Sequence, residues 1–146
     1  MQGRIWLLEI NTRISQSHCD LFEKVDGISH QQVTIDLGLG NRPDMPHREG
    51  AFPIAAKFFY RVFFADARVT RVPTPDELAA LEADFPGAMI AVQVEEGQWL
   101  SALPEQDSYS YALAYVWMGA SSSEQLLADY DRLAARLVFE YDNIQG

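Results

Sequence analysis

Two long runs of alternating side chains constrain the fold most strongly. In residues 57–64, the even-numbered positions are all aromatic or β-branched, and the odd-numbered positions are Lys57, Phe59, Arg61 and Phe63. In residues 109–117, large aromatic or leucine side chains alternate with small ones. Successive side chains of a strand point to opposite faces, so both runs predict long strands with two covered faces. These strands favour an α+β fold, a mainly antiparallel sheet with helices packed on it.

Helix signals separate the predicted strands. Thr74-Pro75-Asp76-Glu77 combines a capping threonine, a proline in the first turn and an acid three residues on, so it predicts a helix start, and Pro86-Gly87 ends that helix. Residues 123–137 repeat apolar side chains at helical spacing, and we expect this helix to lie across the aromatic face of the 109–117 strand. A turn at residues 95–98 contains Glu95 and Glu96, for which we expect no chemical role.

Two shorter helices are predicted near the amino terminus. Residues 18–25 form the first, which Asp26-Gly27 ends because glycine permits a left-handed cap. Ser29 and Gln32 have the spacing of a reciprocal cap and open the second helix, which runs to residue 40. Its inward side chains are expected to be Val33 and Leu37, together with Ile28 before it. Residues 41–50 are predicted to be a loop.

Composition excludes several classes of protein. The 146 residues are 48% hydrophobic, enough for one core, so we expect a single domain over residues 1–146. A formal charge of -10 without a basic cluster argues against nucleic acid and anionic membranes as partners. Cys19 is the only cysteine, which excludes an internal disulfide and favours a reducing compartment. No apolar stretch approaches the roughly 20 residues that span a bilayer, so the expected location is the cytoplasm.

The opening motif carries the chemistry. An apolar run at residues 5–8 is followed by Glu9, Asn11 and Arg13 at alternate positions, and in a strand over residues 4–14 they would share one face. Mg²⁺ is a hard cation held by a few protein oxygens, with phosphates and water completing its octahedron, so Glu9 and Asn11 could supply those oxygens. Arg13 would face a carboxylate or phosphate. The alternative is a strand with a solvated charged face.

The same motif resembles the metal-binding strand of ATP-grasp ligases, closest to the biotin carboxylase branch. Glu9 to Ile14, His18 and Lys24-Val25-Asp26-Gly27 follow the pattern of that strand and the helices after it. Further segments resemble the carboxy-terminal strands and helix of that branch in the same order: residues 50–61, 68–71, 107–119 and 123–137. The resemblance implies that residues 1–49 end the ATP-grasp lobe and that residues 50–146 form the carboxy-terminal subdomain.

The resemblance also implies a missing part. ATP-grasp enzymes clamp ATP between two lobes, and their lysines, glycine-rich loop and adenine-contacting strand precede the segment seen here. Neither common glycine-rich phosphate motif occurs in this chain. The expected partner is therefore an amino-terminal ATP-grasp lobe or subunit, with Mg²⁺ and ATP as cofactors of the complete enzyme. The chain alone is expected to be inactive.

One departure from the family pattern bears on the substrate. Biotin carboxylases carry Gln-Val-Glu before the histidine, and that glutamate is implicated in deprotonating bicarbonate, whereas this chain reads Ser15-Gln16-Ser17. A serine is no general base at neutral pH without a neighbouring base, which favours a ligase that activates an organic carboxylate as an acyl phosphate. Arg13 would orient that carboxylate, and Ser15, Ser17 and His18 would line the acceptor side.

Lys57 completes the predicted site residues. It lies where the resembled strand carries a basic residue, on the same strand face as Arg61, and could help to bind an anionic substrate. The structural alternative is a lysine whose apolar stem covers a sheet edge. His30 and His47 have no ligand spacing around them and are expected at the surface.

Three functional hypotheses remain open. The first is the carboxy-terminal part of an ATP-grasp carboxylate–amine ligase, with Arg13 as the catalytic residue. The second is a bicarbonate-activating unit like biotin carboxylase. The third is a noncatalytic binding or dimerisation module, a homodimer among its forms, which the richness in aromatic residues would suit.

Overall fold

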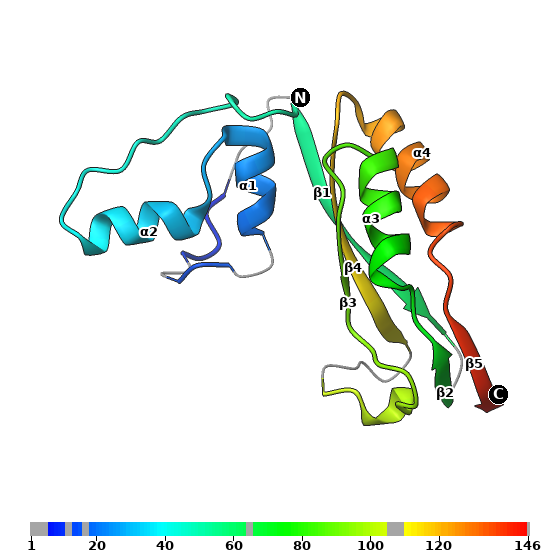
Figure 1. Ribbon diagram of the computed structural model, residues 1–146. Helices are drawn as coiled ribbons and strands as arrows, with labels where there is room; N and C mark the ends of the chain where they lie inside the picture. Colours follow the sequence, from blue (N-terminus) through cyan, green and yellow to red (C-terminus); the bar gives the residue numbers. More distant parts are fainter. Residues whose placement is uncertain (1–5, 11–12, 16–17, 64–65, 105–109, 146) are drawn as a thin grey trace.

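The computed structural model describes residues 6–10, 13–15, 18–63, 66–104 and 110–145. Four α-helices, five strands and a short 3-10 helix occur in these ranges, and the sheets are antiparallel, so the predicted α+β fold is confirmed (Figure 1). The elements are α1 Cys19–Asp26, α2 His30–Gly38, β1 Ile54–Val62, β2 Asp66–Arg71, α3 Pro75–Asp84, β3 Met89–Val92, η1 Leu100–Ala102, β4 Tyr111–Ala120, α4 Ser123–Ala134 and β5 Glu140–Gln145.

The main sheet has the strand order β1-β4-β3, and β2 pairs with β5 in a separate two-stranded ribbon. β1 and β4 are paired antiparallel so that Lys57 lies opposite Trp117 and Phe59 opposite Tyr115. After Tyr60 the register shifts, because Arg61 pairs with Ala112 and Leu113 has no opposite residue. Such a β-bulge bends the strand and increases its twist, which directs the far end of β4 toward the ribbon.

One face of the main sheet is covered by helices. α3 and α4 lie on it, and the Phe58 ring stacks on Tyr130 of α4 with 4.0 Å between ring centroids (Figure 1). Small and medium side chains of β4 let the helices approach closely. The buried members of this core are Leu81, Phe85, Ile90, Ala114, Val116, Met118, Ala120, Leu126, Leu133 and Leu137.

A second core lies between the bulged end of the sheet and the ribbon. It contains Leu100 of η1 and Leu113 at the bulge, both fully buried. Asp66 joins β2 to η1, because its carboxylate accepts from the amide and the hydroxyl of Ser101 at 3.0 and 2.7 Å. This ribbon includes β5, a strand that the sequence pattern did not predict.

The predicted helix starts are mostly confirmed. Thr74 and Glu77 form the reciprocal cap of α3, and Gly27 ends α1 in the left-handed conformation with φ of 87°. Ser29 caps α2 by accepting from the Gln32 amide, but the Gln32 side chain donates to Asp36 at 3.1 Å. The Gln32 side chain therefore bonds to Asp36, one helical turn further along, and does not complete the expected reciprocal cap at Ser29.

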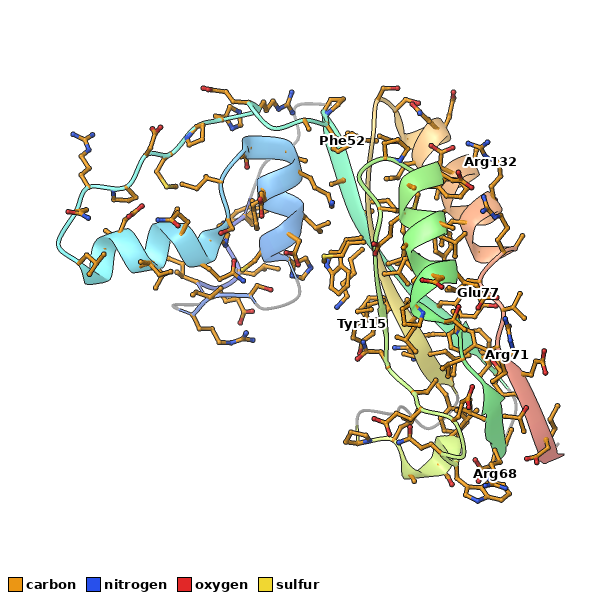
Figure 2. The ribbon with its side chains drawn as sticks, viewed as in Figure 1. Phe52, Arg68, Arg71, Glu77, Tyr115 and Arg132 are labelled. Atoms are coloured by element: carbon orange, nitrogen blue, oxygen red, sulfur yellow. The ribbon has the colours of Figure 1, made fainter. Side chains whose placement is uncertain are left out.

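Two packing expectations are wrong. α4 covers the face of β4 that carries Ala114 and Val116, not the aromatic face, since the small side chains leave room for a helix. Figure 2 shows Tyr115 on the side of the sheet away from α3. In α2 no residue is buried, and Leu37, expected to point inward, is 60% exposed because no other element of the described chain covers it.

In the described ranges, no helix is both long and apolar enough to cross a bilayer.

Candidate functional site

The described residues of the opening segment do not form the strand that we expected. Residues 6–10 and 13–15 have no regular secondary structure, and no strand of the described ranges pairs with them. A strand needs the backbone of a neighbour to satisfy its N–H and C=O groups, so the alternation that would hold Glu9 and Arg13 on one face is not imposed here. Both side chains are exposed. Asn11 and Ser17 lie outside the described residues.

A compact turn connects this segment to α1. The Ser15 hydroxyl and the His18 Nδ1 are 2.6 Å apart, and the His18 amide donates to the Ser15 carbonyl at 3.2 Å. The Cys19 thiol donates to the same carbonyl at 3.1 Å. The structure thus brings together two of the residues predicted to line the acceptor side.

Cys19 itself is fully buried at the start of α1. Burial, together with the neighbouring Asp20 carboxylate, raises the pKa of its thiol. A protonated and inaccessible thiol is a poor nucleophile, in agreement with the packing role predicted from the sequence.

The other end of α1 is tied to the start of β1. The Gly50 amide donates to the Val25 carbonyl at 2.9 Å, and the Phe52 amide donates to the Lys24 carbonyl at 3.0 Å. We call residues 50–52, which make this connection, the junction. The Phe52 ring closes it by lying against both Gly87 and Gly119, where an added Cβ would come within 2.3 and 2.4 Å of the ring. Figure 2 shows Phe52 at this junction, beside the top of β1.

The junction determines where the Ser15–His18 turn lies. α1 packs against β1 and β4 on the side opposite α3 and α4, and it runs back along β1 from the junction (Figure 1). Eight helical residues extend about 12 Å, and a strand advances about 3.3 Å per residue, so the start of α1 is level with a point three to four residues beyond Phe52. The start of α1 therefore lies about level with residues 55–56 of β1.

The face of the main sheet opposite α3 and α4, which we call the outer face and against which α1 packs, surrounds Lys57 with aromatic rings. The Lys57 Nζ is 3.9 Å from the ring centroid of Tyr115 and 4.8 Å from those of Phe59 and Trp117. The rings also contact one another edge to face, with centroids 5.1 Å apart for Phe59 and Tyr115 and 6.1 Å for Tyr115 and Trp117. The ammonium group therefore rests on a connected aromatic row.

Arg61 adds a second cation to the outer face. Its Cζ is 5.4 Å from the Phe59 ring centroid, so Lys57 and Arg61 both contact the same ring. The Arg61 Nη1 donates to the Ser110 hydroxyl at 2.6 Å, and Ser110 is only 4% exposed. A buried polar partner therefore orients the guanidinium on this face.

Sequence reasoning placed Lys57, Phe59 and Arg61 on one face but missed their aromatic partners. Tyr115 and Trp117 were expected beneath the last helix. The register of β1 against β4 brings them beside Lys57, and this register is not encoded in either strand alone. The available sequence signal was the aromatic residues at alternate positions of 109–117 together with the lysine and arginine at alternate positions of 57–64.

Cavities open at several places on the sheet, and one of about 380 Å³ lies between α1 and Met89 of β3. One of about 280 Å³ lies on the outer face and is lined by Gln93, Leu103, Pro104, Ala112 and Tyr115. A larger one of about 460 Å³ lies between the junction and the helices, with Phe52, Phe85, Asp129 and Arg132 among its lining residues. The carboxylates that line this larger cavity already have cationic partners, because Asp129 is bound by Arg132 and Asp84 by Arg136.

Metal-ligating side chains do not gather in the described part of the chain. No group of three or more His, Cys, Asp or Glu side chains there is placed to hold an ion. Mg²⁺ in phosphate-transfer sites needs only one or two protein carboxylates beside phosphates and water. Glu9 fits such a minimal contribution, and the remaining ligands would come from nucleotide, solvent and other protein groups.

Comparison with known proteins adds no family assignment. No protein family model matches the chain, and no curated protein matches its sequence.

Proposed function

We propose that this chain is the carboxy-terminal part of an ATP-grasp carboxylate–amine ligase, which joins a carboxylate to an amine through an acyl phosphate. The observation that carries the proposal is the order of elements after the Glu9-Ile10-Asn11-Thr12-Arg13 motif. The segments that resemble the carboxy-terminal strands and helix of that family form β1, β2, β4 and α4 in the same order.

The amino-terminal side of the molecule supports a partner. Large apolar side chains of the described residues before the junction are exposed to solvent, an arrangement typical of a surface that another protein covers. They are Trp6, Leu7, Leu8, Ile10, Phe22, Ile35, Leu37, Leu39 and Met45. An amino-terminal ATP-grasp lobe is the partner that the proposal requires, and its edge would give the opening segment the strand neighbour that residues 6–10 and 13–14 lack in the described structure.

In the complete site, Mg²⁺ would offset the charge of the ATP phosphates, and Glu9 and Asn11 would hold it. Arg13 would bind the substrate carboxylate with two parallel hydrogen bonds and align it with the phosphoryl group. Ser15, Ser17 and His18 would line the acceptor side, with Lys57 nearby on the outer face. Neither Ser15 nor Ser17 replaces the glutamate that serves bicarbonate chemistry, so an organic carboxylate fits better than bicarbonate.

The test supplies an amino-terminal ATP-grasp lobe, fused ahead of residue 1 or added as a second polypeptide, and measures phosphate release with a panel of carboxylates and amines. We expect turnover that requires both chains and falls about 100-fold or more in Glu9→Ala and in Arg13→Ala, since each removes a group that acts on the phosphoryl transfer. Glu96→Ala and Arg42→Ala, at exposed positions, are the matched controls.

The isolated chain gives an independent check. Calorimetric titration with Mg-ATP should show no saturable binding below the millimolar range, because most of the nucleotide site lies on the other lobe. Tight binding by the chain alone would contradict the proposal. Equal turnover in Glu9→Ala, Arg13→Ala and the controls would instead favour a noncatalytic binding module.

A further inference from the structure

We propose that a second copy of this chain pairs with β1 along the edge of the main sheet. In the described chain, β1 pairs with β4 on one side and with no strand on the other, which we call the open edge. Two β1 strands, antiparallel and related by a two-fold axis, would join two three-stranded sheets into one continuous sheet. This interface lies outside the residues on which the ligase proposal rests.

β1 is far less buried than its partner strand. All nine of its residues are hydrophobic except Lys57 and Arg61, yet none of them is buried. In β4, by contrast, every residue except Tyr115 is buried. α1 packs on one face of both strands and α4 on the other, so the strands differ in having a neighbouring strand on one side or on both. The apolar side chains of β1 therefore retain surface that a further strand would cover.

The hydrogen-bond ladder shows which backbone groups face the open edge. The Gln93 amide donates to the Leu113 carbonyl at 2.8 Å, so the odd-numbered residues of β4 from Leu113 on bond to β3 and the even-numbered ones bond to β1. Before the bulge, even-numbered residues of the two strands lie opposite each other, so the odd-numbered residues of β1 face the open edge. Among them, Ala55 and Phe59 have no partner for their N–H and C=O groups in the described chain.

The opposite edge of the main sheet is protected. β3 forms that edge with only four residues, and the Ile90 amide, which faces away from β4, donates to the Glu82 carboxylate at 2.8 Å. Proteins commonly prevent pairing at sheet edges with short strands and with side chains that cover the backbone. β1 is nine residues long, and no such bond covers Ala55 or Phe59. Of the two edges, the one along β1 is therefore suited to pairing.

The side chains of β1 are compatible with self-pairing. When two copies overlap over all nine residues, Phe58 lies at the two-fold axis opposite the same residue of the second copy. Ile54 then lies opposite Val62 on the same sheet face, so apolar side chains meet apolar side chains. On the outer face Lys57 lies opposite Phe59, not opposite another cation. Because odd-numbered residues face the edge in both copies, this register also aligns their backbone groups as reciprocal pairs.

α4 extends the apolar surface beside the open edge. Tyr130 stacks on Phe58 of β1, whereas Arg132 contacts Phe85 at the end of α3, so α4 has one flank toward β1 and another toward α3. Leu127 precedes Tyr130 by three residues and lies on the flank toward β1, where it is 57% exposed. The two-fold axis at Phe58 would place the same flanks of both α4 helices alongside each other. Pairing would thus bury strand and helix side chains together.

The size of this interface sets the expected affinity. Nine residues of β1 with a few of α4 are fewer than the roughly 20–30 residues on each side of a standard interface, so we expect a dissociation constant of about 10–100 μM. The exposed apolar side chains before the junction are a competing surface for self-association. The experiment must therefore locate the contact as well as measure the mass.

The test is sedimentation equilibrium of the full chain, combined with amide hydrogen exchange by NMR, at concentrations below and above the expected dissociation constant. We expect a monomer that becomes a dimer as the concentration rises. The amides of Ala55 and Phe59 should exchange rapidly in the monomer and become protected in the dimer. The Phe58 amide, which faces β4, should be protected at every concentration.

Variants locate the contact. Ala55→Pro removes an amide at the open edge without removing a bond to β4, and should raise the dissociation constant about tenfold. Leu127→Glu places a charge on the flank of α4 and should raise it by a similar factor. Ala128→Glu, at an exposed position on the solvent side of α4, is the matched control and should leave it unchanged, as should Leu37→Glu before the junction. The dispersed amide spectrum checks that each variant folds.

The outcomes are distinct from those of the ligase test. Concentration-dependent protection of Ala55 and Phe59, together with weaker association in Leu127→Glu but not in Ala128→Glu, would support the dimer. A monomer at every concentration would overturn it. Association that leaves both amides unprotected, or that Leu37→Glu weakens and Ala55→Pro does not, would also overturn it. ATP turnover in the two-chain assay depends on neither result.

Discussion

The residues before the junction and those after it differ sharply in how they use apolar side chains. Among the described residues before the junction, which we call the amino-terminal layer, Cys19 is the one buried hydrophobic residue. All other buried hydrophobic residues of the described chain lie between Ala67 and Leu137, in the part that we call the sheet body. The sheet body therefore contains both hydrophobic cores, and the amino-terminal layer depends on its attachment at the junction.

The two regions therefore differ in their contributions to stability and to recognition. In the sheet body, apolar side chains of the strands are buried by α3, α4 and the β2–β5 ribbon. The amino-terminal layer carries the motif on which the ligase proposal rests, together with most of the large exposed apolar side chains. A segment that is completed by a partner can retain such a surface, since burial occurs only in the complex.

Leucine truncations in the two regions should differ most. Leu133→Ala removes a fully buried side chain from the core under α4, and we expect the free energy of unfolding to fall by about 2–5 kcal/mol. Leu37→Ala, on the exposed surface of α2, should change it by no more than about 0.5 kcal/mol. Urea unfolding followed by circular dichroism measures both. A comparable loss in the two variants would show that the amino-terminal layer has a core of its own.

A substitution of Gly50 at the junction should destabilise the amino-terminal layer without unfolding the sheet body. A Cβ at Gly50 would lie 2.3 Å from the Lys24 carbonyl oxygen and 2.6 Å from the Val25 carbonyl carbon, both backbone atoms. We expect Gly50→Ala to cost about 1–3 kcal/mol and to speed hydrogen exchange in α1, while the amides of β1 and β4 stay protected.

Gly38→Ala is the control for the junction variant. A methyl group added at Gly38 would meet no atom of the described chain within 4 Å, and alanine favours the helix, so protection in α2 should rise or stay the same. Uniform loss of protection throughout the molecule in Gly50→Ala would mean that the two regions unfold as one unit.

Helix caps offer a smaller contrast between the regions. Thr74→Ala removes the cap of α3 in the sheet body, which should lower the free energy of global unfolding by about 1 kcal/mol. Ser29→Ala removes the cap of α2 and should reduce helix content locally, with little change in the global transition. Amide exchange resolved by residue, compared with urea midpoints, distinguishes the two effects. A shift of the global midpoint in Ser29→Ala would contradict the separation.

The smallest expected effect is a pH dependence confined to the sheet body. The Thr74 amide, donating at 2.8 Å, is the main cause that lowers the pKa of Glu77 below 4.5, against a smaller opposing effect of burial, and Arg71 lowers it further. Figure 2 shows Arg71 and Glu77 beside each other. A carboxylate whose folded pKa is depressed stabilises the fold above its unfolded pKa, and this contribution is lost as the pH falls through the folded value.

We therefore expect the wild-type chain to lose more stability than Glu77→Gln as the pH is lowered from 6 to about 3, with the two curves converging at the acid end. Glu96→Gln, in an exposed turn, should follow the wild-type curve. Thermal unfolding across this pH range is the measurement. Parallel curves for the wild type and Glu77→Gln would remove Glu77 from the account of acid sensitivity.

The sequence by itself determined the features that depend on neighbours along the chain. The Thr74 and Glu77 cap, the left-handed end of α1 at Gly27 and the alternation of β1 follow from local backbone and side-chain chemistry, and each was predicted. The α+β fold also followed, because the periods of apolar residues distinguish strands from helices.

Only the tertiary structure decided which surfaces meet. The side of β4 that α4 covers, the bulge at Leu113 and the pairing of β2 with β5 depend on contacts between segments distant in sequence. The same contacts place Tyr115 and Trp117 around Lys57. The expected strand at residues 4–14 differs for the same physical reason: alternation in a sequence indicates a strand, but a strand forms only where another backbone is available to pair with it.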